Sequence, residues 1–180
     1  MNDKEFQQAT FANGCFWCTE TVFLQLRGVK RVVAGYTGGF IKNPCYREIC
    51  NGTTGHAEAI QIEFNESVIS YTDLLEVFFA THDPTTLNRQ GYDVGTQYRS
   101  AIYFHDEKQK EAAEGMIKFL DDNNVFDNKI VTEMSPAGVF YKAEAEHQDF
   151  YKNNPNVRYC SIIIDPKLEK LKAYYHDKLK

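Results

Sequence analysis

The chain has 180 residues, enough to bury a hydrophobic core, and we expect a single domain over residues 1–180, with 166–180 as a charged C-terminal helix or tail. A net charge of -5 and a sequence pI near 5.5 argue against the cationic surfaces that bind nucleic acid or anionic membranes. No segment approaches the roughly 20 apolar residues of a membrane span, and the first residues do not resemble a signal peptide. We therefore expect a cytoplasmic protein, in which five cysteines indicate catalysis or metal binding rather than structural disulfides.

The first predicted helix covers residues 16–26, where apolar side chains recur at helical spacing before Gly28, a common helix stop. Gly14 allows the backbone to turn sharply into this helix, which leaves Cys15 in the first turn. Unpaired amide N–H groups and the positive end of the helix dipole favour a thiolate at that position. Cys18 lies one turn further along, at a separation that allows a disulfide bond. This segment predicts a redox-active nucleophile with a resolving partner.

Strands and helices alternate along the rest of the chain, and some strands follow one another directly. The predicted strands cover residues 29–36, 56–64, 98–104, 130–134 and 159–164. The predicted helices cover residues 44–49, a segment capped by Ser70 and Asp73 that reaches Phe79, a segment capped by Asp106 that reaches Leu120, and the residues from Pro166 onward. This order predicts an α+β two-layer sandwich: a mixed β-sheet with helices packed on one face, a ferredoxin-like core and long active-site loops.

The predicted strand 56–64 carries a carboxylate in an unusual place. Alternation puts Glu58 on the same face as Ile60, Ile62 and Phe64, and that apolar face is expected to be buried. Burial disfavours the charged form, so the pKa of Glu58 is expected to rise unless a cation compensates. A carboxyl group that stays protonated near neutral pH is suited to general acid catalysis. The alternative is that Glu58 lies just beyond the sheet edge and is solvated.

A long polar segment, residues 82–98, separates two predicted elements and is interrupted by glycines. Loops of this length inside a compact domain are more often functional than not. Asp93, Tyr98 and Arg99, with Gln97 beside them, can offer hydrogen-bond donors and acceptors to a substrate. Tyr36, at the end of the strand 29–36, can do the same.

Six short motifs occur in order from about residue 10 to about residue 171. They are Gly14-Cys15-Phe16-Trp17, Gly35-Tyr36-Thr37-Gly38-Gly39, Gly55-His56-Ala57-Glu58, His82-Asp83-Pro84-Thr85, Gly95-Thr96-Gln97-Tyr98-Arg99-Ser100, and Glu144 with His147-Gln148. Each motif alone is a weak signal, but six in register are highly specific. Together they resemble the A-type peptide methionine sulfoxide reductases, the enzymes that act on the S epimer of methionine sulfoxide.

The resemblance implies a mechanism in which Cys15 attacks the sulfoxide sulfur as a thiolate. Glu58 matches the acid of the family and is expected to protonate the sulfoxide oxygen. Tyr36 and Tyr98 match the two hydroxyl donors that hydrogen-bond this oxygen. The product methionine leaves, and Cys15 remains as a sulfenic acid.

The resemblance also implies how substrate and reductant are recognised. Phe16 and Trp17 match the apolar wall that receives the methyl group on sulfur, opposite the polar corner for oxygen, and this pairing distinguishes the two epimers. Asp93 matches a position that helps to organise the substrate site. The expected substrates are free methionine sulfoxide or oxidised proteins, and the expected reductant is an external thioredoxin, or dithiothreitol in its place. Neither a metal nor a bound organic cofactor is expected.

The sequence departs from the commonest family pattern in three places. Many members have Gly where this chain has Cys18 and use a resolving cysteine on a C-terminal tail, but residues 167–180 contain no cysteine. Cys18 is therefore the first candidate for the resolving residue, and Cys160 is the second. Glu146 stands where Tyr is usual, and Cys45 stands where a hydroxyl residue is more ordinary, which predicts a surface or half-buried thiol.

Two other classes of protein fit parts of the cysteine pattern. Cys15, Cys18, Cys45 and Cys50 form two pairs, which is superficially similar to a four-thiolate zinc-binding module, although the second pair is too widely spaced for a usual zinc knuckle. A Cys-x-x-Cys motif at the start of a helix is also typical of a thioredoxin-like dithiol exchanger.

Overall fold

The computed structural model describes residues 6–180. The strands are β1 (Phe6–Asn13), β2 (Val29–Thr37), β3 (Ala57–Asn65), β4 (Arg89–Gln90), β5 (Asp93–Val94), β6 (Ser100–Phe104), β7 (Glu133–Pro136) and β8 (Tyr141–Lys142). The helices are α1 (Phe16–Leu24), α2 (Tyr46–Cys50), α3 (Tyr71–Ala80), α4 (Glu107–Asp122), α5 (Phe150–Asn153) and α6 (Asp165–Tyr175). The capped helices α3 and α4 begin directly after Ser70 and Asp106, as predicted, and both caps accept a backbone N–H.

The main sheet has six strands in the order β7-β6-β1-β3-β2-β8. Its pairs are antiparallel except for β6 and β7, which run parallel, so the sheet is mixed. The four long strands β1, β2, β3 and β6, with α1 and α3 between them, follow the order strand-helix-strand-strand-helix-strand of a ferredoxin-like core. The predicted fold class is therefore confirmed.

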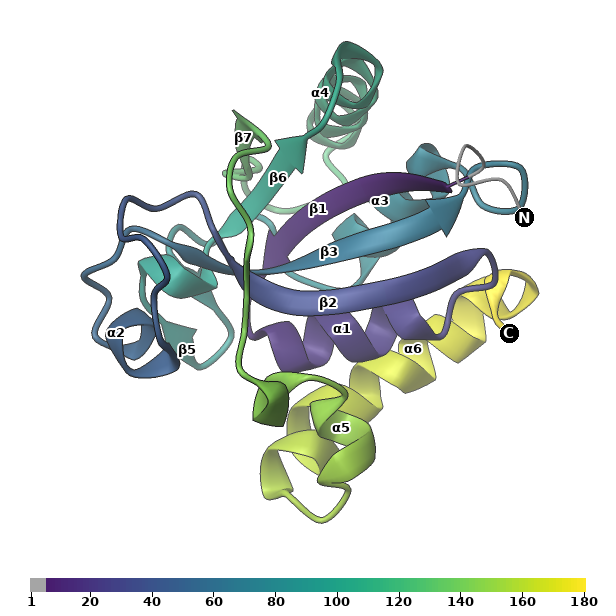
Figure 1. The fold of residues 1–180 in the computed structure, drawn as a ribbon. Helices are drawn as coiled ribbons and strands as arrows, with labels where there is room; N and C mark the ends of the chain where they lie inside the picture. Colours follow the sequence, from purple (N-terminus) through teal and green to yellow (C-terminus); the bar gives the residue numbers. More distant parts are fainter. Residues whose placement is uncertain (1–5) are drawn as a thin grey trace.

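The helices α1, α3 and α6 cover one face of the sheet, with α1 beneath β2 and α6 beside it (Figure 1). The core between these layers contains a large cluster of buried aromatic and aliphatic side chains, among them Phe11, Phe23, Ile60, Ile62, Phe64 and Phe78. The segment that runs from β7 to α5 passes in front of the opposite face (Figure 1), which carries buried alanines packed against Ala137 and Phe140. Small side chains on this face allow the crossing segment to lie close to the sheet.

The central strand β1 is absent from the sequence prediction. It pairs with β3 on one side and β6 on the other, so most of its residues are buried, including the polar Thr10 and Asn13. Thr10 forms a hydrogen bond to His105, and Asn13 accepts one from Thr19. Because these polar groups are satisfied by residues elsewhere in the fold, the strand tolerates a composition that does not predict a core strand.

The predicted strand 159–164 is wrong. Residues Cys160–Ile164 form a wide helical turn that continues directly into α6, and its buried residues Cys160 and Ile164 face Cys15 and Cys18. Periodicity does not distinguish a short apolar run in a strand from one in a buried helix. Here the helical form places Cys160 and Ile164, four residues apart, against α1. The segment has no free edge of the main sheet to join, because β7 and β8 occupy both edges.

Two other predicted strands are shifted. The strand expected over 98–104 begins at Ser100, because Thr96–Tyr98 form a 3₁₀ turn, and the strand expected over 130–134 is β7.

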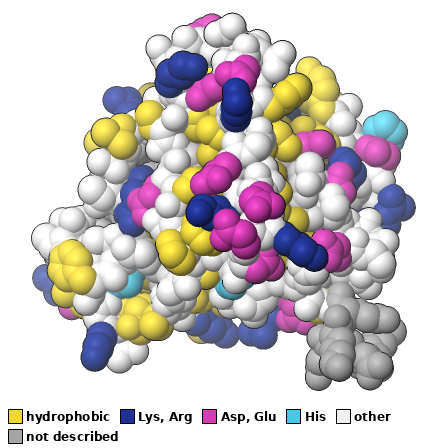
Figure 2. Space-filling view, turned by 90° about the horizontal axis from the view of Figure 1, so that it is seen from above, with side chains coloured by type: hydrophobic (Ala, Val, Ile, Leu, Met, Phe, Trp, Pro, Cys, Tyr) yellow, Lys and Arg dark blue, Asp and Glu magenta, His cyan; other side chains and the backbone are white. Residues whose placement is uncertain are grey.

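On the face seen in Figure 2, acidic and basic side chains are interspersed. Among residues 6–180, no helix is both long and apolar enough to cross a membrane.

Candidate active site

The start of α1 has the geometry that the glycine and cysteine motif predicts. Gly14 has φ +105°, and a Cβ at this position would lie 2.8 Å from the side chain of Gln90, so a larger residue is excluded on both grounds. Cys15 follows as the residue that caps α1, with its side chain buried. The nucleophile candidate therefore lies at the first turn of a helix, between β1 and a loop that presents Gln90.

The carboxyl group of Glu58 lies at this same helix start. Its Oε2 atom accepts a hydrogen bond of 3.0 Å from the backbone N–H of Phe16, and the side chain is 2% exposed. The buried face predicted for this strand is confirmed, and the alternative of a solvated carboxylate is wrong. Burial raises the pKa of Glu58 to about 8, against the opposing effect of the Phe16 N–H, and the charge of Asp93 raises it further. Glu58 therefore holds a proton at neutral pH.

The sequence predicts a thiolate at Cys15, whereas the structure favours the protonated thiol. Burial raises the pKa of Cys15 well above its ordinary value, and the hydrogen bond to Cys18 and the charge of Glu58 raise it further, while the Trp17 N–H has a smaller opposing effect. The physical reason lies in the tertiary structure: the thiol is buried, and the first of the amide N–H groups that the prediction assigns to the thiolate donates to Glu58 instead. Cys15 is therefore a thiol in the resting state.

The second thiol, Cys18, has the lower pKa of the two. The hydrogen bond from Cys15 lowers the pKa of Cys18 to about 7, and Lys167 and Tyr159 lower it against the effect of burial. Sγ of Cys18 lies 3.6 Å from the Tyr159 hydroxyl, which donates a 2.8 Å hydrogen bond to Asp93. Asp93 therefore reaches the thiol pair through Tyr159. Sequence reasoning missed Tyr159, because it lies in the run that was interpreted as a strand.

Three tyrosines converge near Glu58, but their hydroxyl groups have different partners. The hydroxyl of Tyr36 donates a 2.8 Å hydrogen bond to Glu144, whose other oxygen accepts the backbone N–H of Tyr46 at 2.7 Å. Tyr36 is fully buried, whereas Tyr46 and Tyr98 are half-buried. Burial raises the pKa of both Tyr46 and Tyr98, and the charge of Glu58 contributes to both shifts. Sequence reasoning missed Tyr46, although it lies within the predicted helix 44–49.

Aromatic rings surround the start of α1 and hold Trp17. The Trp17 indole stacks on Phe150 with centroids 3.7 Å apart and an interplanar angle of 5°. Its Nε1–H donates to Nδ1 of His147 at 3.1 Å, and the His147 ring contacts both Phe16 and Tyr46. Phe16, which is buried, and Trp17 therefore pack against residues 144–150, more than 120 positions away in the sequence; their role as a wall for the substrate methyl group stays a prediction.

Several residues of the six motifs have structural partners instead of facing the thiols. Arg99 forms an ion pair of 2.9 Å with Glu133 and fixes the loop to β7. Gln97 is buried in the 3₁₀ turn. The ring of His82 is hydrogen-bonded to the Phe78 carbonyl and to Ser100, and burial lowers its pKa to about 3, so it is neutral. These contacts hold the long loop in place and thereby fix the positions of Asp93 and Tyr98.

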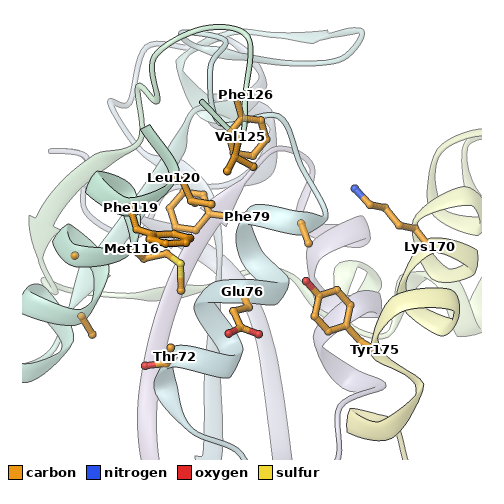
Figure 3. Close-up of a pocket in the computed structure, with 13 residues that line it drawn as sticks. Thr72, Glu76, Phe79, Met116, Phe119, Leu120, Val125, Phe126, Lys170 and Tyr175 are labelled. Atoms are coloured by element: carbon orange, nitrogen blue, oxygen red, sulfur yellow. The ribbon is translucent and has the colours of Figure 1, made fainter. Parts of the chain in front are cut away.

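A cavity of about 320 Å³ opens beside the two thiols and is lined by Cys15, Cys18, Asp93, Tyr159 and Lys167 among others. A larger cavity of about 730 Å³ lies between α3, α4 and α6, where Figure 3 shows Phe79, Met116 and Phe119 around it. The larger cavity contains none of the groups described above. The smaller cavity therefore gives access to the two thiols from the side of Asp93 and Tyr159, whereas Glu58 and Trp17 do not line it.

The remaining cysteines are distributed in two ways. Cys45 and Cys50 are exposed at the two ends of α2, whereas Cys160 is buried in the same cluster as Cys15 and Cys18. Within residues 6–180, no group of three or more Cys, His, Asp or Glu side chains is arranged to hold a metal ion. The four cysteines of the zinc alternative are therefore not brought together.

Comparison with known proteins identifies the family. The family described as "Peptide methionine sulfoxide reductase" matches residues 7–179. The chain is 56% identical over 174 residues to the peptide methionine sulfoxide reductase MsrA of Deinococcus radiodurans, a match that covers 97% of this chain and 84% of that protein. The crystal structure of reduced Mxr1 from Saccharomyces cerevisiae superposes with a TM-score of 0.78 at 33% identity, over 88% of this chain and 91% of that one.

A second structure of the yeast protein, Mxr1 in complex with Trx2, superposes with a TM-score of 0.55 at 26% identity, over 83% of this chain and 87% of that one. The cysteine spacing leaves two alternatives open, the zinc-binding module and the dithiol exchanger. The match with the family over nearly all of the described residues decides against both. Cys15 and the buried carboxyl group of Glu58 at the start of α1 lie inside the matched region. The chain therefore belongs to the peptide methionine sulfoxide reductase family.

Proposed function

We propose that the protein reduces the S epimer of methionine sulfoxide, free or in proteins, by attack of Cys15 on the sulfoxide sulfur. The observation that carries this proposal is the pairing of Cys15 with a buried carboxyl group, Glu58, whose raised pKa of about 8 keeps it protonated at neutral pH. One group is the nucleophile and the other is the acid that the leaving oxygen requires.

The first step begins from a thiol. With its pKa near 7, Cys18 is partly ionised at neutral pH and is hydrogen-bonded to the Cys15 thiol, so it can accept the Cys15 proton when substrate binds. The Cys15 sulfur then bonds to the sulfoxide sulfur, and Glu58 donates its proton to the oxygen. Transfer of the hydroxyl group to Cys15 releases methionine and leaves a sulfenic acid. The sulfoxide gains two electrons, and Cys15 loses two.

We propose that Tyr46 and Tyr98 are the hydroxyl groups that hold the sulfoxide oxygen. Both side chains are half-buried, and the charge of Glu58 contributes to the raised pKa of each. Tyr36, which the family resemblance suggests for this role, donates its hydroxyl hydrogen to Glu144. Because Glu144 also accepts the Tyr46 backbone N–H, Tyr36 is better suited to position Tyr46 than to contact the substrate.

The aromatic wall of Phe16 and Trp17 is proposed to receive the methyl group on sulfur. A methyl group against rings and an oxygen against two hydroxyl groups fix the chirality at sulfur, because the opposite epimer would leave buried polar groups unpaired. Asp93 is proposed to act on the second thiol through Tyr159.

The sulfenic acid is proposed to be resolved by Cys18. The Cys18 thiol attacks the Cys15 sulfur, water leaves with the hydroxyl oxygen, and a Cys15–Cys18 disulfide forms. Cys160 is the second candidate, since it belongs to the same buried cluster. In either case the first turn of α1 or the turn at 160–164 must distort to expose the disulfide.

A dithiol reductant of the thioredoxin class is proposed to reduce this disulfide and restore both thiols. The yeast relative has been solved in complex with Trx2, which supports a partner of this kind. The electron balance is complete with the two cysteines and this reductant, so no bound cofactor is proposed. Residues 1–180 are proposed to act as one catalytic domain, and the five unpaired cysteines suit the reducing cytoplasm.

Methionine release, measured once without external reductant and once with thioredoxin, tests this scheme. Cys15→Ser is expected to release no methionine. Cys18→Ser lacks the proposed acceptor of the Cys15 proton, so it is expected to release about one methionine per enzyme, more slowly than the wild type, and then to stop even in the presence of thioredoxin. Cys160→Ser is the matched control and is expected to turn over repeatedly. Full thioredoxin-dependent turnover of Cys18→Ser, with loss in Cys160→Ser, would transfer the resolving role to Cys160. Release of methionine by Cys15→Ser would refute the scheme.

A further inference from the structure

A buried carboxyl group on α1, Glu20, has no part in the chemistry above. It is 2% exposed and lies three residues after Trp17, so both side chains project from the same face of the helix. Burial raises the pKa of Glu20 to about 7, and its Oε2 atom is buried without a hydrogen-bond partner. Such a group is costly to bury and requires an explanation.

The partners of Glu20 are backbone groups at the beginning of α5. Oε1 accepts a 3.1 Å hydrogen bond from the N–H of Asp149, and the N–H of Phe150 also stabilises the carboxylate. Asp149 has a left-handed backbone (φ 52°, ψ 35°) and caps α5. The first N–H groups of a helix have no partner within the helix, so the Glu20 carboxyl supplies the acceptor that they lack. Glu20 therefore fixes the place where α5 begins.

Phe150, the first residue of α5, stacks on the Trp17 indole with nearly parallel rings. The indole N–H donates a hydrogen bond to His147, three residues before Phe150. The segment 147–150 thus contacts α1 at two points: its backbone is bound by Glu20, and its rings are in contact with Trp17. Movement of this backbone would move both groups that hold the indole.

We infer that Glu20 is a positioning residue: by binding the Asp149–Phe150 backbone, it sets the orientation of the Trp17 indole at the substrate site. The consequence for catalysis rests on the proposed function, in which Trp17 is part of the wall for the substrate methyl group. Loss of the carboxyl group is expected to weaken substrate binding and leave the reacting atoms unchanged.

The chain contains one tryptophan, so its fluorescence reports on Trp17 alone. We would compare Glu20→Ala with Glu20→Gln, whose amide oxygen can still accept the Asp149 N–H. The matched control is Lys152→Ala, an exposed residue of α5 that lines the same cavity of about 360 Å³ as Glu20. The measurements are tryptophan emission, quenching by acrylamide, and KM and kcat for free methionine sulfoxide with dithiothreitol.

For Glu20→Ala we expect red-shifted emission, stronger quenching and a KM raised about 5- to 30-fold at unchanged kcat, the range for one lost buried hydrogen-bond partner. Glu20→Gln and Lys152→Ala are expected to retain the wild-type emission and KM. Unchanged emission and quenching in Glu20→Ala would overturn the inference. A red shift with unchanged KM would support the positioning role and refute the wall proposed for Trp17. Should Glu20→Ala not fold, Glu20→Asp, whose carboxyl is withdrawn by one methylene, is expected to show the same red shift.

Discussion

Replacement of Glu58 by glutamine removes the proposed proton donor and is expected to make the protein more stable at alkaline pH. The folded state raises the pKa of Glu58 from 4.5 to about 8, because the carboxyl group is 2% exposed. Since the folded pKa is the higher one, the unfolded chain releases the proton first as pH rises. Stability therefore falls between about pH 4.5 and pH 8 and then levels off.

The magnitude follows from about 1.4 kcal/mol per pKa unit. The raised pKa lowers the free energy of unfolding by under about 1 kcal/mol at pH 5, about 3 kcal/mol at pH 7 and about 5 kcal/mol at pH 9. Glutamine does not ionise, and its amide oxygen can still accept the Phe16 N–H that Glu58 accepts. The advantage of Glu58→Gln over the wild type is therefore expected to grow by about 4 kcal/mol between pH 5 and pH 9.

Urea unfolding followed by circular dichroism at pH 5, 7 and 9, with excess dithiothreitol, measures this difference. Glu146→Gln is the matched control, because that side chain is 79% exposed, and its difference from the wild type is expected to stay flat. In single-turnover assays, Glu58→Gln is expected to release methionine about 10² to 10⁴ times more slowly. A stability difference that does not change with pH would refute the raised pKa, and an unchanged single-turnover rate would refute the role as acid.

The remaining predictions concern the tyrosines and the thiols. Tyr46→Phe and Tyr98→Phe are each expected to slow single-turnover reduction at least about tenfold, since each removes a hydrogen bond to developing charge, which rapid-quench kinetics would measure. Tyr36→Phe is expected to lower the free energy of unfolding by about 1–3 kcal/mol through the loss of the bond to Glu144, with a smaller effect on the rate; the opposite ranking would restore Tyr36 as a substrate contact. Alkylation with iodoacetamide, mapped by mass spectrometry, is expected to modify Cys18 with a midpoint near pH 7 and Cys15 only at higher pH; earlier modification of Cys15 would contradict the order of the two pKa values.

The parts of the site that the sequence predicted are those that depend on neighbouring residues. Helical spacing after Gly14 was sufficient to place Cys15 and Cys18 at the start of α1. Strand alternation was sufficient to place Glu58 on the buried face, because a period of two fixes which side chains share a face. Local capping signals likewise located the starts of α3 and α4.

Only the tertiary structure decided which groups carry protons and which rings meet the substrate site. Burial raises the pKa of Cys15 and keeps it protonated in the resting state, while the N–H of Phe16 binds Glu58 and not the thiol; no local pattern contains either feature. Tyr159 and Phe150 reach α1 from more than 120 residues away, and β1 is central despite its polar composition because distant residues satisfy it. Periodicity fixes the direction of a side chain, whereas its pKa and its partners depend on burial and on contacts that form only when remote segments pack together.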